Sequence, residues 1–139
     1  MKQSVIAGFN PSRVFAAGAL SAAVAVGLGA FGAHALRSTL AAQELVIYET
    51  AVRYQMYHAL ALLAAGLGGK FWAPDNPRNF RTAGWCFAVG TLLFSGSLYG
   101  LCLSGATWLA YLTPIGGTLF LGGWIFLFMA ALKGTETTN

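Results

Sequence analysis

The sequence is poor in charge, and above all in acidic residues. Only 9% of its 139 residues are charged, whereas a soluble domain carries about 25%. It has four carboxylates, and none of them lies inside a long apolar stretch: Glu44, Glu49, Asp75 and Glu136. Proton-coupled carriers usually need an acid embedded in the membrane, so this distribution disfavours a small transporter.

Paired cysteines, catalytic motifs and dense basic patches are also missing. Cys86 and Cys102 are separated in one predicted helix by a rise of about 24 Å, which is beyond the reach of a disulfide. No phosphate-binding glycine motif and no nucleophile–base pair is recognisable, which disfavours an enzyme. The basic residues give a net charge of +4 but are spread over several joints, so lipid headgroups rather than nucleic acid are the expected anionic neighbours.

Four long apolar runs fill the rest of the chain: Val14–Leu36, Tyr54–Gly69, Thr82–Leu103 and Leu109–Leu132. At about 1.5 Å per residue, three of them can cross a hydrocarbon core of about 30 Å, and the second can do so with part of its polar N-terminal extension. We therefore predict an all-α integral membrane protein, a single domain over 1–139 with four transmembrane helices in a bundle. The expected helices are 14–36, 46–69, 82–103 and 109–132.

The first run is long for a cleaved signal peptide. Ala33-His34-Ala35 has the form of a cleavage site. The apolar stretch before it, however, exceeds the roughly 7–15 residues of a signal peptide. We expect this run to be retained as the first helix.

The basic residues fall mainly on one side of the predicted membrane. Four crossings put both termini on that side, which receives six basic residues, whereas the other side receives two. Cytoplasmic joints carry the excess of Lys and Arg, so the N and C termini should be cytoplasmic. The six are Lys2, Arg13, Lys70, Arg78, Arg81 and Lys133, and the two are Arg37 and Arg53.

The joint between the first two runs is typical of a helix. Ser38 or Thr39 could serve as its N-cap, and Glu49 and Arg53 form an i,i+4 pair. We therefore predict an amphipathic helical segment here, lying in or above the outer interface, from which the second helix continues.

Thr113-Pro114 is typical of a helix start, with threonine as the N-cap and proline at the first helical position. The last helix would then begin at Pro114, and Gly105 would be free to end the preceding one. The alternative is a single helix from Trp108 that is kinked by Pro114.

Polar side chains collect in the outer half of the predicted bundle. His34 and His58 each share a helical face with small residues, which mark helix contacts, so both imidazoles should point into the bundle at similar depth. Gly96 and Gly100 form a GxxxG pattern that predicts a helix contact. The candidate ligand-binding residues are His34, Arg53, Tyr54, Gln55, His58, Ser95, Ser97, Tyr99 and Thr113.

The third run carries a polar stripe of its own. The stripe should face protein, because lipid offers a hydroxyl group no partner. Its members are Thr91, Ser95, Tyr99 and Cys102.

Several roles are open for the two histidines. Each could bond a neighbouring helix and fix packing, or the pair could bind a ligand with Arg53, Gln55 and Tyr99. Two imidazoles could also ligate a haem. A zinc or copper site is disfavoured because the nearby carboxylates lie outside the apolar runs. We expect no cofactor, with haem or metal at His34/His58 as the alternative.

Four segments, in this order along the chain, closely resemble one family: 29–36 (GAFGAHAL), 51–60 (AVRYQMYHAL), 94–99 (FSGSLY) and 113–117 (TPIGG), with Gly123-Trp124 beyond. The family is the domain of unknown function 423, which includes the bacterial YgdD-like inner-membrane proteins and a vertebrate relative named transmembrane protein 256. This resemblance implies a four-helix protein of the cell inner (plasma) membrane, or of the mitochondrial inner membrane if the protein is eukaryotic. It supplies no catalytic role.

These observations favour a small, non-enzymatic structural or accessory subunit of a membrane assembly. Its expected neighbours are membrane lipids, copies of itself or a larger membrane complex, and not nucleic acid. The alternative is an outer-leaflet protein that binds a small molecule, lipid, quinone or haem through the His34/His58 cluster, or a small transporter. An enzyme acting on lipid or quinone, with a histidine as proton-transfer group, is a third class.

Overall fold

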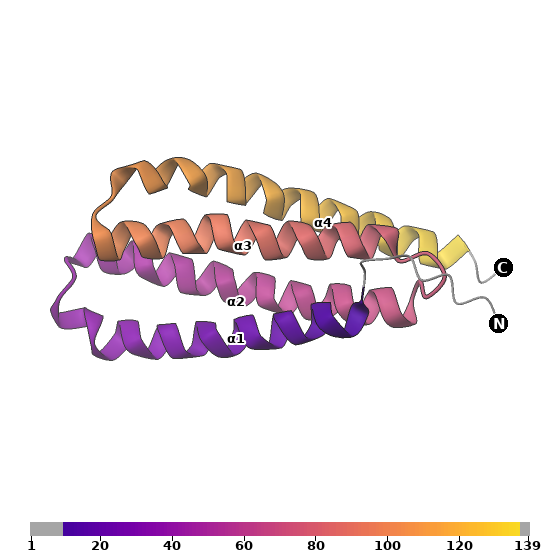
Figure 1. Cartoon of the computed structure of the whole chain (residues 1–139), viewed down its shortest axis with the longest axis horizontal. Coiled ribbons are helices and arrows are strands. Elements are labelled where there is room, and N and C mark those ends of the chain that lie inside the picture. Colours follow the sequence, from indigo (N-terminus) through magenta and orange to yellow (C-terminus); the bar gives the residue numbers. More distant parts are fainter. Residues whose placement is uncertain (1–9, 137–139) are drawn as a thin grey trace.

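Four long helices make up nearly all of the structure, a computed structural model that describes residues 10–136 (Figure 1). Each helix packs antiparallel against the next in the chain, with α2 and α3 inside and α1 and α4 outside. The predicted all-α four-helix bundle is confirmed. The helices are α1 (Pro11–His34), α2 (Ala42–Phe71), α3 (Arg78–Ser104) and α4 (Leu112–Glu136), and two short 3₁₀ helices, η1 (Leu36–Ser38) and η2 (Thr107–Tyr111), lie in the joints.

The start of α4 lies close to the predicted proline. Gly105 ends α3 with a φ of 69°, in the left-handed region that favours glycine, as expected. The α-helix begins at Leu112, so Pro114 lies in its first turn, where its missing N–H has no partner to lose. The predicted range 109–132 begins three residues before α4, in the 3₁₀ helix Thr107–Tyr111 that leads directly into it. The alternative of one α-helix from Trp108 is wrong, because the chain at Trp108 belongs to this 3₁₀ helix.

The N-terminal half of α2 differs from the prediction. Neither Ser38 nor Thr39 caps it; the Glu44 carboxylate instead accepts the Ala41 N–H at 2.8 Å. From Ala42 the helix runs unbroken to Phe71. Its early residues pack along α1, where the Tyr48 hydroxyl donates to the Leu28 carbonyl at 3.0 Å. The predicted amphipathic segment is therefore the first part of a bundle helix, not a separate helix along the interface.

Glycine brings neighbouring helix backbones close together. A Cβ on Gly18 of α1 would lie 2.9 Å from the Ala59 carbonyl oxygen of α2, and one on Gly116 of α4 would lie 2.5 Å from the Phe94 nitrogen of α3. The predicted contact at Gly96 and Gly100 is wrong as a contact between long helices. Gly96 has no neighbour within 4 Å of such a Cβ, and Gly100 meets only the side chain of Leu109 in η2.

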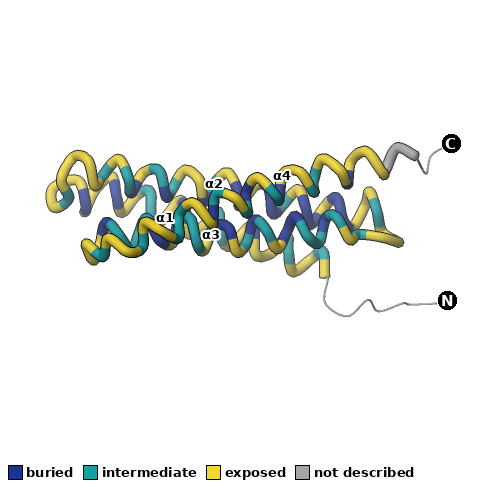
Figure 2. The backbone as a smooth tube through the Cα atoms, turned by 90° about the horizontal axis from the view of Figure 1, so that it is seen from above, coloured by how far each residue is buried: buried dark blue, intermediate teal, exposed yellow. Residues whose placement is uncertain are grey.

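The outer surface of the bundle is apolar. Buried residues lie along its axis and exposed ones face outward along its whole length (Figure 2). Leu20, Leu92 and Leu121 are 67%, 73% and 68% exposed, which a surface in water would rarely present in such numbers. Within the described residues, three segments are long and apolar enough to cross a membrane: Pro11–Ser38, Arg78–Ser104 and Thr107–Lys133. α2 is not among them, although it is as long as its neighbours.

Candidate functional site

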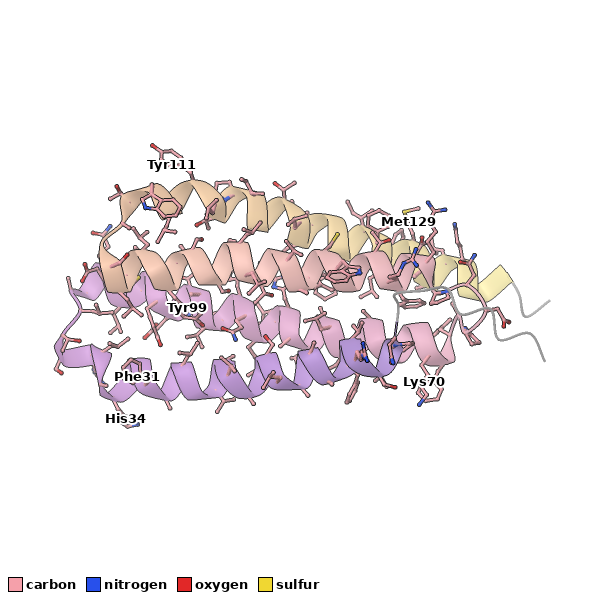
Figure 3. The ribbon with its side chains drawn as sticks, viewed as in Figure 1. Phe31, His34, Lys70, Tyr99, Tyr111 and Met129 are labelled. Atoms are coloured by element: carbon pink, nitrogen blue, oxygen red, sulfur yellow. The ribbon has the colours of Figure 1, made fainter. Side chains whose placement is uncertain are left out.

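Gln55 joins three helices in the interior of the bundle. Its amide group on α2 donates from Nε2 to the Ser21 carbonyl of α1 at 3.1 Å, and its Oε1 accepts the Tyr99 hydroxyl of α3 at 2.8 Å. The Tyr99 ring points into the bundle and lies 5.1 Å from the Tyr48 ring (Figure 3). We call Ser21, Tyr48, Gln55 and Tyr99 the glutamine bridge. Both ends of a buried amide are thereby used to hold helices together.

His58 lies further along α2 in a box of aromatic rings and is 4% exposed. Its ring stacks on Phe120 of α4 with centroids 3.4 Å apart, and Phe87 and Trp124 lie beside it. Nδ1 lies 2.8 Å from the Tyr54 carbonyl oxygen, and the Trp124 indole N–H donates to Nε2 at 3.3 Å. We call His58, Phe87, Phe120 and Trp124 the histidine box.

The two partners fix the protonation of His58. A carbonyl oxygen can only accept and an indole N–H can only donate, so Nδ1 carries the proton and Nε2 is the acceptor. The imidazole is therefore neutral, and both of its nitrogens are occupied. A metal could bind it only after one of these bonds is broken.

His34 does not join His58. It is exposed at the end of α1 and points away from the bundle (Figure 3). Gly18 of α1 packs against Ala59, so His58 lies level with the N-terminal half of α1, roughly 24 Å from His34 along the bundle. The prediction that both imidazoles point inward at similar depth is wrong, and one chain cannot ligate a haem or metal with this pair.

The error has a physical cause in α1. The helix buries one narrow face, on which Gly18, Ala25 and Gly32 recur every seven residues. His34 follows Gly32 by two positions, or about 200° round the helix. The predicted face of His34 consists of Ala23, Gly27 and Ala30, at helical spacing before it. All three are exposed, and a Cβ on Gly27 would meet nothing within 4 Å.

The remaining candidate residues form small separate groups. Ser97 of α3 and Thr113 of α4 share a hydrogen bond of 2.8 Å. Arg53 lies 3.9 Å from Glu49, with both side chains more than half exposed. Tyr54 is partly exposed and stacks on Phe94 with centroids 4.7 Å apart. The structure thus does not gather the nine candidates into one site.

The polar stripe of α3 faces protein, as predicted. The Thr91 hydroxyl donates to the Phe87 carbonyl at 2.8 Å, and the Cys102 thiol donates to the Glu44 carbonyl at 3.3 Å. Ser95 is 1% exposed, and its hydroxyl has no partner among the described residues.

Cys86 and Cys102 are both free, as expected. Among the side chains that the structure describes, no three His, Cys, Asp or Glu converge on a possible metal site.

Two residues that bond the bundle together were missed by the sequence analysis, the buried Tyr48 and the partly exposed Trp124. Tyr48 is 1% exposed and belongs to the glutamine bridge, and Trp124 completes the histidine box. A seven-residue repeat on α2 could have revealed the first, because Tyr48, Gln55 and Leu62 all lie on its buried face. No pattern on α4 points to the second, because its partner is on another helix.

The glutamine bridge predicts coupling between Gln55 and Tyr99. Gln55→Leu should leave the Tyr99 hydroxyl without a partner and lower stability by about 1–2 kcal/mol. Tyr99→Phe should lower stability by a similar or smaller amount. The double variant should lose clearly less stability than the two single losses added together. Thermal melts of the four proteins in detergent measure this. Additive losses would show that the two side chains do not act together.

An antiparallel helical bundle with an apolar outer surface and polar groups bonded across its interior defines a multi-pass membrane protein. This chain belongs to the family described as "Protein of unknown function (DUF423)", which matches residues 28–117. The family resemblance of the sequence is thereby confirmed. The matched range includes the glutamine bridge residues Tyr48, Gln55 and Tyr99 but ends before Phe120 and Trp124.

Curated relatives carry no activity in their names. The chain is 47% identical to a UPF0382 membrane protein of Staphylococcus epidermidis over 116 residues, which are 84% of this chain and 92% of the relative. It is 44% identical to the UPF0382 membrane protein YwdK of Bacillus subtilis over 117 residues, 84% and 93% of the two chains. A UPF0382 membrane protein of Haemophilus influenzae is 44% identical over 115 residues, 83% and 90%. No solved structure matches the chain.

Proposed function

We propose that this chain is a non-enzymatic structural or accessory subunit of an assembly in the bacterial inner membrane. One observation carries this proposal: of the four buried polar side chains that the structure describes, all but Ser95 form hydrogen bonds within the bundle. Gln55 and His58 use both ends of their polar groups in this way, and Ser97 bonds Thr113. Such bonds fix one packing of the helices. The surface offered to a partner is then the outer apolar face.

The proposal includes four crossings, with α2 as the fourth. α2 has 30 residues, lies between α1 and α3, and turns Tyr48, Gln55 and His58 to the interior. A helix sheltered in this way can cross the membrane with more polar residues than a lipid-facing one, because its partners are protein groups. The first turn of α1, the joint between α2 and α3, and the last turns of α4 share one end of the bundle, which supports a common side for both termini (Figure 1).

Reporter fusions test the orientation. Five of the six basic residues assigned to the cytoplasm are described, and Lys2 lies outside the described residues. Alkaline phosphatase is active only outside the cytoplasm, so a fusion at Asn139 should be inactive, whereas a fusion to a chain truncated at Thr39 should be active. Activity at Asn139 would overturn the orientation.

Mass spectrometry of the gently solubilised native protein tests the role as a subunit. We expect the chain to be recovered with a second membrane protein or with copies of itself in a fixed ratio. A monomer that carries one small molecule per chain would favour the ligand-binding alternative instead.

A second candidate function is small-molecule binding at the opposite end from the joint 72–77. A groove of about 250 Å³ opens there between α1 and α2, lined by Gly29, Gly32, Ala33, Tyr48, Glu49, Val52 and Arg53. It includes one predicted ligand-binding residue, Arg53, whose guanidinium group is only loosely paired with Glu49. A bound molecule that is lost in Arg53→Gln, with the melting temperature unchanged, would establish this function.

A further inference from the structure

A cavity of about 700 Å³ lies at the end of the bundle that we assign to the cytoplasm. It is bounded by the joint between α2 and α3, the first turns of α3 and the last turns of α4. A volume of this size is typical of sites for small organic ligands. Among its lining residues are Asp75, Arg78, Phe80, Phe126, Ala130 and Lys133.

The cavity has a polar rim that favours an anion. Arg78 of α3 and Lys133 of α4 reach it from two helices, and Asp75 of the joint contributes one opposing charge, so the lining carries a net charge of +1. The only ion pair among the described side chains is Arg53–Glu49 at the other end. Among the side chains that the structure describes, no carboxylate lies within ion-pair distance of Arg78 or Lys133.

The start of α3 adds to this attraction. Pro77 precedes the helix and provides no side-chain cap, so the first N–H groups of α3 have no side-chain acceptor. Arg78, Asn79 and Phe80 in this first turn all line the cavity. Unpaired N–H groups and the positive end of the helix dipole are suited to a phosphate group.

Part of the cavity wall is apolar. Phe126 and Ala130 of α4 line it, and the exposed Trp72 stands at its edge, 62% exposed. Tryptophan is enriched at the headgroup level of membranes. A ligand that fits must therefore combine a phosphate group with a hydrocarbon part.

We propose that this cavity binds the headgroup of an anionic phospholipid, such as phosphatidylglycerol, from the cytoplasmic leaflet. The choice of leaflet depends on the orientation proposed above, whereas the binding itself does not. The phosphate lies against Arg78, Lys133 and the start of α3, and the first part of an acyl chain lies along Phe126 and Ala130. The single negative charge of phosphatidylglycerol matches the net charge of the lining.

Native mass spectrometry of the purified full chain in detergent tests this binding. The protein is titrated with phosphatidylglycerol, phosphatidylethanolamine or phosphatidylcholine that carry the same acyl chains. We expect phosphatidylglycerol to bind at least several-fold more tightly than the other two. Arg78→Gln and Lys133→Gln should each weaken it about fivefold, the effect of one basic residue near an anionic headgroup. Arg37→Gln is the matched control, because Arg37 is exposed at the opposite end and should leave binding unchanged.

Four outcomes would overturn the proposal. If phosphatidylcholine binds as tightly as phosphatidylglycerol, the cavity does not select an anion. If phosphatidylethanolamine binds as tightly as phosphatidylglycerol, Asp75 binds the amine of the headgroup and the selection is not for net negative charge. If Arg37→Gln weakens phosphatidylglycerol binding as much as Arg78→Gln does, the effect comes from the overall charge of the protein and not from this cavity. Displacement by millimolar glycerol phosphate would indicate a soluble phosphate compound. The binding is measured in detergent, so it does not depend on the orientation of the protein in the membrane. If the reporter fusions show the reverse orientation, only the leaflet that supplies the lipid changes.

Discussion

Replacing Gly116 with alanine should destabilise the protein by about 1–3 kcal/mol, the range for overpacking a tightly packed contact. The new Cβ would lie 2.5 Å from the Phe94 nitrogen and 2.9 Å from the Gly90 carbonyl oxygen. Both are backbone atoms of α3, so they can yield only if the two helices move apart. Gly116→Val should cost more. The melting temperature of the purified protein in detergent measures both.

Gly122 provides a control in the same helix. A Cβ there would meet nothing within 4 Å. Because alanine is the better helix former, Gly122→Ala should leave stability unchanged or raise it by up to about 1 kcal/mol. If Gly116→Ala is as well tolerated as Gly122→Ala, the close approach of α3 and α4 at this position is wrong.

The sequence predicts the helices well because membrane helices are signalled by composition. Long apolar runs bounded by prolines and charges gave four helices, and Gly105 and Pro114 located the break between α3 and α4 to within two residues. The start of α2 is harder to predict from the sequence. Ser38 and Thr39 are both good capping residues, but Ser38 ends the 3₁₀ helix η1, Thr39 follows it, and the Glu44 side chain caps α2 instead.

Which face of a helix is buried is harder to predict when small residues surround it. α1 is so rich in alanine and glycine that several faces satisfy the rule that small residues mark contacts. The true contact follows a seven-residue repeat through Gly18, Ala25 and Gly32, and His34 lies off it. The buried face of α2 is easier to predict, because bulky or polar residues recur on it and distinguish it from the other faces of the helix.

The position of α2 explains why its hydropathy is low. α2 packs against both α1 and α3, so Tyr48, Gln55 and His58 on its buried face meet protein groups, whereas a lipid-facing position would leave them without partners. These three buried residues thus indicate an inner position in the bundle. Their partners, Ser21, Leu28 and Trp124, lie 20 to 66 residues away in sequence. No local pattern can predict such pairs, which is why the candidate site was predicted only in part.

Replacing His58 distinguishes a packing role from a ligand-binding role. His58→Leu should lower stability by about 2–3 kcal/mol, because the Trp124 indole N–H loses its acceptor and the ring stack on Phe120 is lost. His58→Gln retains an acceptor of similar reach and loses only the stack, so it should cost about 0.5–1.5 kcal/mol. Thermal melts in detergent give both values.

Trp124→Phe is the complementary variant, since it removes the same hydrogen bond from α4 while keeping an aromatic ring. In the double variant with His58→Leu, Trp124→Phe should lower stability by less than it does alone, because the hydrogen bond between the two side chains is already absent. Absorption and metal content are measured on the same preparations. If glutamine and leucine at position 58 are equally damaging, and a Soret band or a bound metal present in the unaltered protein disappears from both, His58 is a ligand and the packing role is refuted. A graded loss with unchanged spectra is the expected result, because both imidazole nitrogens are already engaged by Tyr54 and Trp124.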